Sequence, residues 1–281
     1  MSAENAPRRW LITGANSGFG AAFTRAVLDA GDEVIAAVRR PESMAEVVAA
    51  HPDRVQVLTL DVRDAAAAER AVKEAGRIDV LINNAGYGIV GAIEEVSEAE
   101  LRDAMEVMFY GPLRLTQLVL PQLRERRAGA IVQVTSMGGF LSFPGVGMYS
   151  AAKGALELAS EALAAEVAPL GIQVLIVEPG SFRTSFAKPA ALRVSTGLAD
   201  YAETVGAVRD GLPASDQQQE GDPAKAAAAV IATVGQANPP LRLALGPDAV
   251  AAIRGKLAAV AADLDATAHL GLSTGVDTAA N

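Results

Sequence analysis

Tyr149 and Lys153 stand four residues apart in a stretch of helix-forming residues. Residues at positions i and i+4 lie on the same face of a helix, so the phenol and the ammonium are expected to be neighbours. A free tyrosine titrates near about pH 10, too high for efficient proton transfer at neutral pH. A nearby positive charge favours the phenolate and lowers the pKa. The spacing therefore indicates a tyrosine that acts as a general acid or base.

A glycine-rich turn, Gly14-Ala15-Asn16-Ser17-Gly18-Phe19-Gly20, lies between a short apolar run and a helical pattern. Glycines permit a tight turn and a close approach of the backbone to a pyrophosphate. The N-terminus of the following helix offers free N–H groups and a favourable dipole. The turn predicts a dinucleotide site, and a glycine turn without a ligand is the alternative.

The order of these motifs resembles the short-chain dehydrogenase/reductase family. The turn, with Thr13 before it, has that family's T-G-x-x-x-G-x-G spacing. The other matching segments are Asp61-Val62, Asn83-Asn84-Ala85-Gly86, Ser136, the Tyr149–Lys153 motif, Pro179-Gly180 and Thr184. The similarity runs from about Arg9 to Leu245, nearly the whole chain. A Tyr–Lys pair alone is weak evidence, whereas this ordered set is specific.

The resemblance implies that Ser136, Tyr149 and Lys153 are the catalytic residues of a nicotinamide-dependent oxidoreductase. Tyr149 would transfer a proton to a carbonyl or from an alcohol, and Ser136 would hydrogen-bond the same oxygen. Lys153 would also bond the nicotinamide ribose. The residues expected to bind the cofactor are Gly14, Asn16, Ser17, Gly18, Phe19, Gly20, Arg39, Asp61, Val62, Asn84, Ala85, Gly86, Tyr149, Lys153, Pro179, Gly180, Phe182 and Thr184. Family members are commonly oligomers, so a homodimer or homotetramer is also implied.

The residues Val38-Arg39-Arg40, at the end of the second apolar run, bear on the choice of cofactor. NAD enzymes commonly place an Asp or Glu here to bond the ribose 2′-hydroxyl, and this chain has no carboxylate at that position. Arg39 can instead pair with a 2′-phosphate. We therefore expect NADP(H). The alternative is an NAD-preferring dehydrogenase in which both arginines only face solvent.

Met108 departs from the family pattern, which has an asparagine at this place. In the family, the asparagine helps to hold a water in the proton relay behind the lysine. A methionine cannot replace the side-chain hydrogen bonds, although its main-chain carbonyl remains. The relay is then rerouted or turnover is slower. Met108 is also the feature that favours another class of function, a cofactor-binding sensor or regulator with little turnover.

Apolar side chains are frequent between Ser136 and Tyr149 and in neighbouring loops. The residues expected to bind substrate are Tyr87, Phe140, Phe143, Val146 and Phe186. Such a lining suits a bulky, largely apolar ketone, aldehyde or secondary alcohol. The alternative is that these residues only pack a lid.

Strand-like and helical patterns alternate along the chain. Strands are expected at 10–13, 33–38, 55–60, 79–82, 130–135, 172–177 and 241–245, and helices at 18–30, 65–75, 98–123 (bent near 111–112), 149–170 and 223–236. The alternation predicts an α/β fold, a doubly wound, Rossmann-like parallel sheet of about seven strands in three layers. We expect one domain over 1–281. Its core covers about 9–245, with a lid of two short helices at about 181–222, then an extra helix from 247 and a polar tail.

The composition limits the other classes of function. The chain has 281 residues, 51% hydrophobic and 20% charged, which suits a folded globular domain. It has no cysteine, which excludes thiolate catalysis and zinc–thiolate sites, and its two histidines are far apart, so no metal is expected. The net charge of −9 does not favour a nucleic-acid partner. No signal peptide or membrane span is visible, so we expect a cytoplasmic protein without a membrane partner.

Overall fold

The computed structural model describes residues 6–276 and contains a seven-stranded sheet whose paired strands are all parallel. The strands, in spatial order, are β3 (Val55–Thr59), β2 (Glu33–Val38), β1 (Arg9–Thr13), β4 (Val80–Asn83), β6 (Gly129–Val134), β7 (Ile172–Pro179) and β9 (Arg242–Leu245). The predicted doubly wound α/β fold is confirmed.

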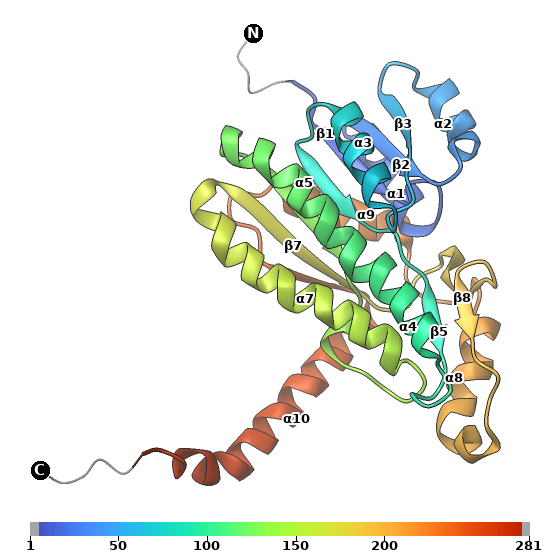
Figure 1. The fold of residues 1–281 in the computed structure, drawn as a ribbon, viewed down its shortest axis with the longest axis vertical. Coiled ribbons are helices and arrows are strands. Elements are labelled where there is room, and N and C mark those ends of the chain that lie inside the picture. The colour runs from blue at the N-terminus through green and yellow to red at the C-terminus, as the bar shows by residue number, and fades with distance from the viewer. Residues whose placement is uncertain (1–5, 277–281) are drawn as a thin grey trace, which may run out of the picture.

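Helices cover both faces of this sheet (Figure 1). One face packs against α1 (Gly18–Asp29) and α9 (Pro223–Val234), and the other against α3 (Ala65–Ala75), α5 (Gly111–Arg126) and α7 (Gly147–Val167). A strand that is covered on both sides must be apolar on both sides. This explains why the strands are continuous apolar runs: β2, for example, has five successive buried residues.

The parallel strands place their carboxyl ends along one edge of the sheet. The chain moves outward from β1 to β2 and β3, and then returns to lay β4 on the other side of β1. Open α/β sheets bind ligands in the crevice at such a reversal of strand order. The segments that follow β1, β4, β6 and β7 carry the predicted motifs, so the topology brings these motifs together at one edge.

The helix expected at 98–123 is interrupted. The structure has α4 (Glu98–Met105), a π-helical turn at Glu106–Tyr110, and then α5. The interruption comes just before the Gly111-Pro112 pair at which the sequence predicted a bend. Pro112 has no N–H to donate, and a Cβ at Gly111 would lie only 2.9 Å from Val62 Cβ, so the helix passes very close to the loop after β3 here.

Several elements were not predicted, or were predicted differently. α2 (Ala45–Ala50), β5 (Gly88–Val90) and β8 (Leu192–Val194) are too short to produce a periodic pattern, and β5 pairs with β8 as a separate small sheet. The segment 181–222 contains β8 and one α-helix, α8 (Ala202–Ala214), rather than two short helices.

The last helix, α10 (Pro247–Leu272), follows β9 and extends away from the body of the molecule (Figure 1). The predicted tail reaches residues 277–281, which lie outside the described residues. Among the helices of residues 6–276, none combines the length and the apolar character needed to cross a lipid bilayer.

Asp32, in the turn before β2, holds the amino end of the sheet. Its carboxylate accepts hydrogen bonds from the Trp10 indole (2.8 Å) and from the Arg8 guanidinium (3.0 Å), and the Trp10 side chain is completely buried. In Asp32→Ala the indole N–H loses its acceptor, so we expect the free energy of unfolding to fall by roughly 1–3 kcal/mol. Urea denaturation measures this change. Asp29→Ala, at an exposed position of α1, is the control, and equal losses in the two variants would contradict this role.

Candidate active site

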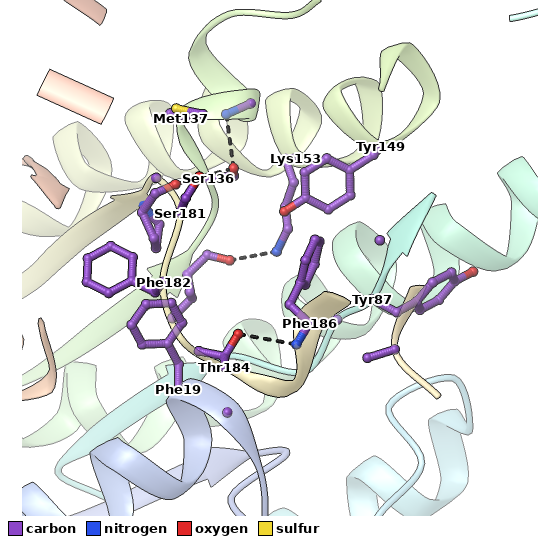
Figure 2. A pocket seen from close by; sticks show the side chains of 18 of the residues that line it. Phe19, Tyr87, Ser136, Met137, Tyr149, Lys153, Ser181, Phe182, Thr184 and Phe186 are labelled. Atoms are coloured by element: carbon purple, nitrogen blue, oxygen red, sulfur yellow. Dashed lines mark hydrogen bonds between the residues drawn. The ribbon is translucent and has the colours of Figure 1, made fainter. Parts of the chain in front are cut away.

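Ser136, Tyr149 and Lys153 meet in a cleft of about 280 Å³ at the carboxyl edge of the sheet (Figure 2). Tyr149 and Lys153 project from the first turns of α7, and Ser136 follows β6. The Ser136 hydroxyl accepts a hydrogen bond from the Gly138 N–H (3.0 Å), which fixes its side chain. The predicted trio is therefore brought together, with two hydroxyl groups beside each other above one ammonium.

Lys153 is buried beneath these hydroxyl groups. Its Nζ donates to the Val134 carbonyl at the end of β6 (2.8 Å), and its side chain lines the cleft. An ammonium has three N–H donors, and this bond uses one of them. Burial penalises the charged form and lowers the pKa of Lys153 to about 8. The lysine is thus fixed in place with donors that can serve a bound molecule.

The pKa of Tyr149 differs from the sequence-based expectation. Burial raises it to about 12, although the hydrogen bond with Ser136 acts in the opposite direction. The ammonium of Lys153 was expected to lower this pKa. In the structure desolvation of the phenol dominates, because the phenolate would be a charge in an apolar cleft, and the Lys153 ammonium makes no contribution to the shift. In the chain alone Tyr149 is therefore firmly protonated.

The glycine turn between β1 and α1 forms a cradle at the other end of the cleft. Gly14 and Gly18 have φ angles of +66° and +52°, which L side chains rarely adopt, and a Cβ at Gly20 would lie 2.0 Å from the Gly14 carbonyl oxygen. Ser17, the N-cap of α1, makes no side-chain bond to the first helical turn. The N–H groups of that turn are left for a ligand, and they suit a pyrophosphate.

Asn84 and Ala85 are held against this turn by Thr13. The Thr13 hydroxyl accepts from both of their N–H groups (2.9 Å each), and the Asn84 amide donates to the Thr13 carbonyl (2.9 Å). The predicted cofactor residues that line the cleft beside Ser136, Tyr149 and Lys153 are Gly14, Ser17, Gly18, Phe19, Asn84, Ala85, Gly86, Pro179, Gly180, Phe182 and Thr184. The residues present therefore fit a nicotinamide dinucleotide.

The other predicted cofactor residues do not line this cleft. Arg39 and Asp61 line a second cavity of about 530 Å³ beside β3 and α3. The carboxylate of Asp61 pairs with Arg63 at 2.6 Å, which lowers its pKa. Asn16, Gly20 and Val62 line neither cavity. Gly20 acts through the close packing of the turn, and Val62 is buried.

The predicted substrate residues are only partly brought together. Phe143, Val146 and Phe186 line the cleft, and the Phe186 ring meets the Tyr149 ring edge to face at 5.9 Å. Tyr87 lines the cleft too, but its hydroxyl donates to Asp103 (2.6 Å) and points away from Tyr149 (Figure 2).

Phe140 is not placed in the cleft, contrary to the sequence prediction. Its ring lies beneath the Arg242 guanidinium, 6.0 Å from the ring centroid. The reason is that residues Met137–Phe140 form a short helix, α6, which turns this side chain away from the edge. The number of apolar residues between Ser136 and Tyr149 could not reveal the short helix α6.

Met108 lies in the π-helical turn and is completely buried. A Cβ built on Gly86 would lie 3.6 Å from its Cγ and Sδ atoms and 3.5 Å from Lys153 Nζ. The methionine therefore packs directly behind the Gly86 loop and close to Lys153. Its thioether fills space there and can accept only weakly.

Two buried carboxyl groups behind Lys153 were missed by the sequence analysis. Glu157, one turn after Lys153 on α7, accepts from the Thr135 hydroxyl (3.0 Å), and Glu178 near the end of β7 pairs with Arg242 (3.2 Å). Burial, with Glu178 beside it, raises the pKa of Glu157 to about 8. The i+4 spacing from Lys153 could have indicated that Glu157 lies on the same face of the helix. No local pattern indicated that Glu178, on β7, lies beside it.

The similarity to known proteins covers the part of the chain that contains Ser136, Tyr149 and Lys153. The family model described as short chain dehydrogenase matches residues 8–193. A 3-ketodihydrosphingosine reductase of Bacteroides thetaiotaomicron is 38% identical over 86% of this chain and 88% of its own length.

Two solved structures extend the similarity to the fold. A short-chain dehydrogenase from Streptomyces avermitilis is 48% identical and superposes with a TM-score of 0.92, covering 98% of this chain and all of that one. A short chain dehydrogenase from Burkholderia cenocepacia, solved with NADP, is 26% identical with a TM-score of 0.71 over 92% of this chain and 96% of its own.

The buried Glu157 predicts a pH-dependent stability. A carboxyl whose pKa is raised in the folded state binds a proton that the unfolded chain has already released. Its contribution is therefore complete below about pH 4.5 and is lost as the pH rises through about 8. We expect the free energy of unfolding to fall between pH 5 and pH 8. Glu157→Gln, which cannot ionise, should remove on the order of 3 kcal/mol of this fall.

Urea denaturation at several pH values measures the slope. Glu166→Gln is the matched control, because Glu166 is an exposed residue of the same helix. Its slope should equal that of the wild type. Parallel curves for the wild type and Glu157→Gln would contradict the assignment of the proton to Glu157.

Proposed function

Because this chain belongs to the short-chain dehydrogenase/reductase family of oxidoreductases, we propose that it is an NADP(H)-dependent enzyme with Tyr149 as its general acid and base. It reduces a ketone or aldehyde, or oxidises a secondary alcohol. The observation that carries this proposal is the placement of the Tyr149 and Ser136 hydroxyl groups together in an apolar cleft above the buried Lys153.

In this proposal the substrate oxygen lies between the two hydroxyl groups. Ser136 donates a hydrogen bond to this oxygen and stabilises the negative charge that develops on it. Tyr149 gives its proton to the same oxygen in reduction, or accepts the alcohol proton in oxidation. The bound nicotinamide supplies or accepts the hydride. Lys153 bonds the nicotinamide ribose with the donors that Val134 leaves free, and its charge supports the phenolate.

The raised pKa of Tyr149 suits the reductive direction. A protonated phenol is the acid that reduction needs, and burial holds Tyr149 in that form. Oxidation needs a lower pKa, which requires positive charge beside the phenol. An oxidised nicotinamide carries such a charge, so bound cofactor would help to tune Tyr149 for the reverse reaction.

We base the proposed NADP(H) preference on the position and charge of Arg39. This residue lines the second cavity, directly after β2, where an NAD enzyme commonly has a carboxylate. It can form a forked pair with a 2′-phosphate. The similar structure from Burkholderia cenocepacia was solved with NADP and the one from Burkholderia phymatum with NAD, so the proposed preference rests on Arg39.

The substrate is proposed to be bulky and largely apolar. The wall of the cleft beside Tyr149 carries Phe143, Val146 and Phe186, and Val208 and Leu212 of α8 close it from the lid. Apolar walls with two convergent hydroxyl groups suit a carbonyl on an apolar frame. The relative from Bacteroides thetaiotaomicron is named for the reduction of a 3-keto compound, which agrees with the carbonyl class.

Tyr149→Phe should abolish turnover, by about 10³-fold or more, because the proton donor is removed. The ring remains, so NADPH affinity should change less than about threefold. A panel of apolar ketones with NADPH, read by NADPH absorbance, measures turnover, and fluorescence titration measures binding. Tyr110→Phe, at an exposed position, is the control. Activity in Tyr149→Phe would refute the catalytic role, and NADPH binding without turnover by the wild type would favour the sensor alternative.

Arg39→Asp should weaken NADPH binding by at least tenfold and leave NADH binding nearly unchanged. The new carboxylate repels a 2′-phosphate and can accept a bond from a 2′-hydroxyl. Arg40→Asp is the matched control, because Arg40 is the next residue along the chain, is exposed and does not line the second cavity. Equal effects of Arg39→Asp on both cofactors would show that this arginine does not bind the phosphate.

A further inference from the structure

α10 leaves most of its surface uncovered. It contacts α6 and β9 only near its beginning, and Ala249 is its one buried residue. Figure 1 shows the rest of the helix standing away from the body. Isolated helices are marginally stable in water, and most helices gain their stability by packing an apolar face. A projecting helix of 26 residues therefore calls for a partner.

The partner face is visible in the spacing of the apolar residues. Val250, Ile253, Leu257, Val260 and Leu264 follow one another at steps of three and four residues. This 3-4 repeat places them in one stripe, as in the seam of a coiled coil. The stripe begins against the body and continues into the uncovered part, where Leu257, Val260 and Leu264 are 54%, 47% and 64% exposed.

The base of α10 is held firmly to the cofactor-binding edge. The Asp248 carboxylate accepts from the Ser181 N–H (2.7 Å), and the Gly180 N–H donates to the Leu245 carbonyl (2.9 Å). The direction in which the helix projects is therefore set by the fold. A rigid apolar stripe that stands away from the body is suited to pair with another helix.

The charges beside the stripe are arranged for a second copy of the same helix. Lys256 and Asp263 lie on one flank of the stripe, and Arg254 and Asp265 lie towards the other. Each pair has a basic residue nearer the body and an acidic residue nearer the tip. An antiparallel neighbour brings its acidic half beside this basic half, and the same pairing repeats at the other end. A parallel neighbour would place basic beside basic.

We propose that α10 is a dimerisation helix that pairs antiparallel with α10 of a second copy of this chain. Around the two-fold axis Leu257 packs against Val260 of the second copy, and Ile253 packs against Leu264. Burial of these side chains stabilises the pair, and the charges select its direction. The two bodies lie at opposite ends of the helix pair.

A lipid surface is a poorer fit for the stripe. Helices that lie on membranes are rich in Lys and Arg on the polar face. From Arg254 onward α10 has Arg254 and Lys256 against Asp263 and Asp265, with no excess of positive charge. The proposal does not depend on the reaction proposed above, because no residue of the stripe lines the cleft.

The mass of the full chain in solution tests the pairing. Leu257→Asp/Leu264→Asp should halve the mass measured by sedimentation at micromolar concentration, because two charges would be buried in the seam. Ala259→Asp/Ala262→Asp adds the same charge on the opposite face of α10 and should keep the wild-type mass. NADPH binding by both variants shows that the body is folded. An unchanged mass in the first variant, or wild-type binding to anionic vesicles in place of self-association, would overturn the proposal.

Disulfide trapping tests the direction, and the chain has no cysteine of its own. Positions 253 and 264 are about 16 Å apart along a helix, beyond the reach of a disulfide within one chain. A mixture of Ile253→Cys and Leu264→Cys chains should form a mixed disulfide dimer on oxidation, and neither chain alone should form one. Disulfides within each single variant would indicate a parallel pair and overturn the antiparallel arrangement.

Discussion

The parallel pairing of the seven strands is the constraint on which the rest of the structure depends. It requires a helix between successive strands, and these helices bury both faces of the sheet. It also places the loops of all the strands at the same edge. The glycine turn after β1, Ser136 after β6 and the loop after β7 are far apart in sequence, yet they line one cleft.

Burial shifts the pKa values of the groups behind this cleft more strongly than their direct contacts do. Lys153, Glu157 and Glu178 are all buried within one region between α7 and the ends of β6 and β7, and the pKa of each is shifted toward its neutral form. The carboxyls find partners in Thr135 and Arg242. Because unpartnered polar groups are costly in a core, this network also locks α7 to the sheet and so fixes the height of Tyr149 above it.

Two parts of the chain lie outside the doubly wound core. The lid is tied down by Glu95, which accepts from the Leu198 N–H (2.7 Å) and the Ser195 hydroxyl (3.2 Å) and pairs with Arg209 of α8. This holds the apolar side of α8 over the cleft. α10 has no comparable contacts beyond its base, and its apolar stripe faces outward. The lid therefore shapes the site from within the chain, whereas α10 is proposed to act between chains.

The sequence alone determined the layered fold, the glycine turn and the Ser136, Tyr149 and Lys153 constellation. These follow from local patterns, such as apolar runs, glycines before a helix and the i, i+4 spacing, because local geometry depends on neighbouring residues. The interruption of the helix before Gly111, the turning away of Phe140 and the pairing of β5 with β8 depended on tertiary structure. So did the raised pKa of Tyr149, since desolvation is set by groups that come from distant parts of the chain. The types of the residues proposed to be catalytic were thus readable from the sequence, but their electrostatic state was decided only by what the fold packs around them.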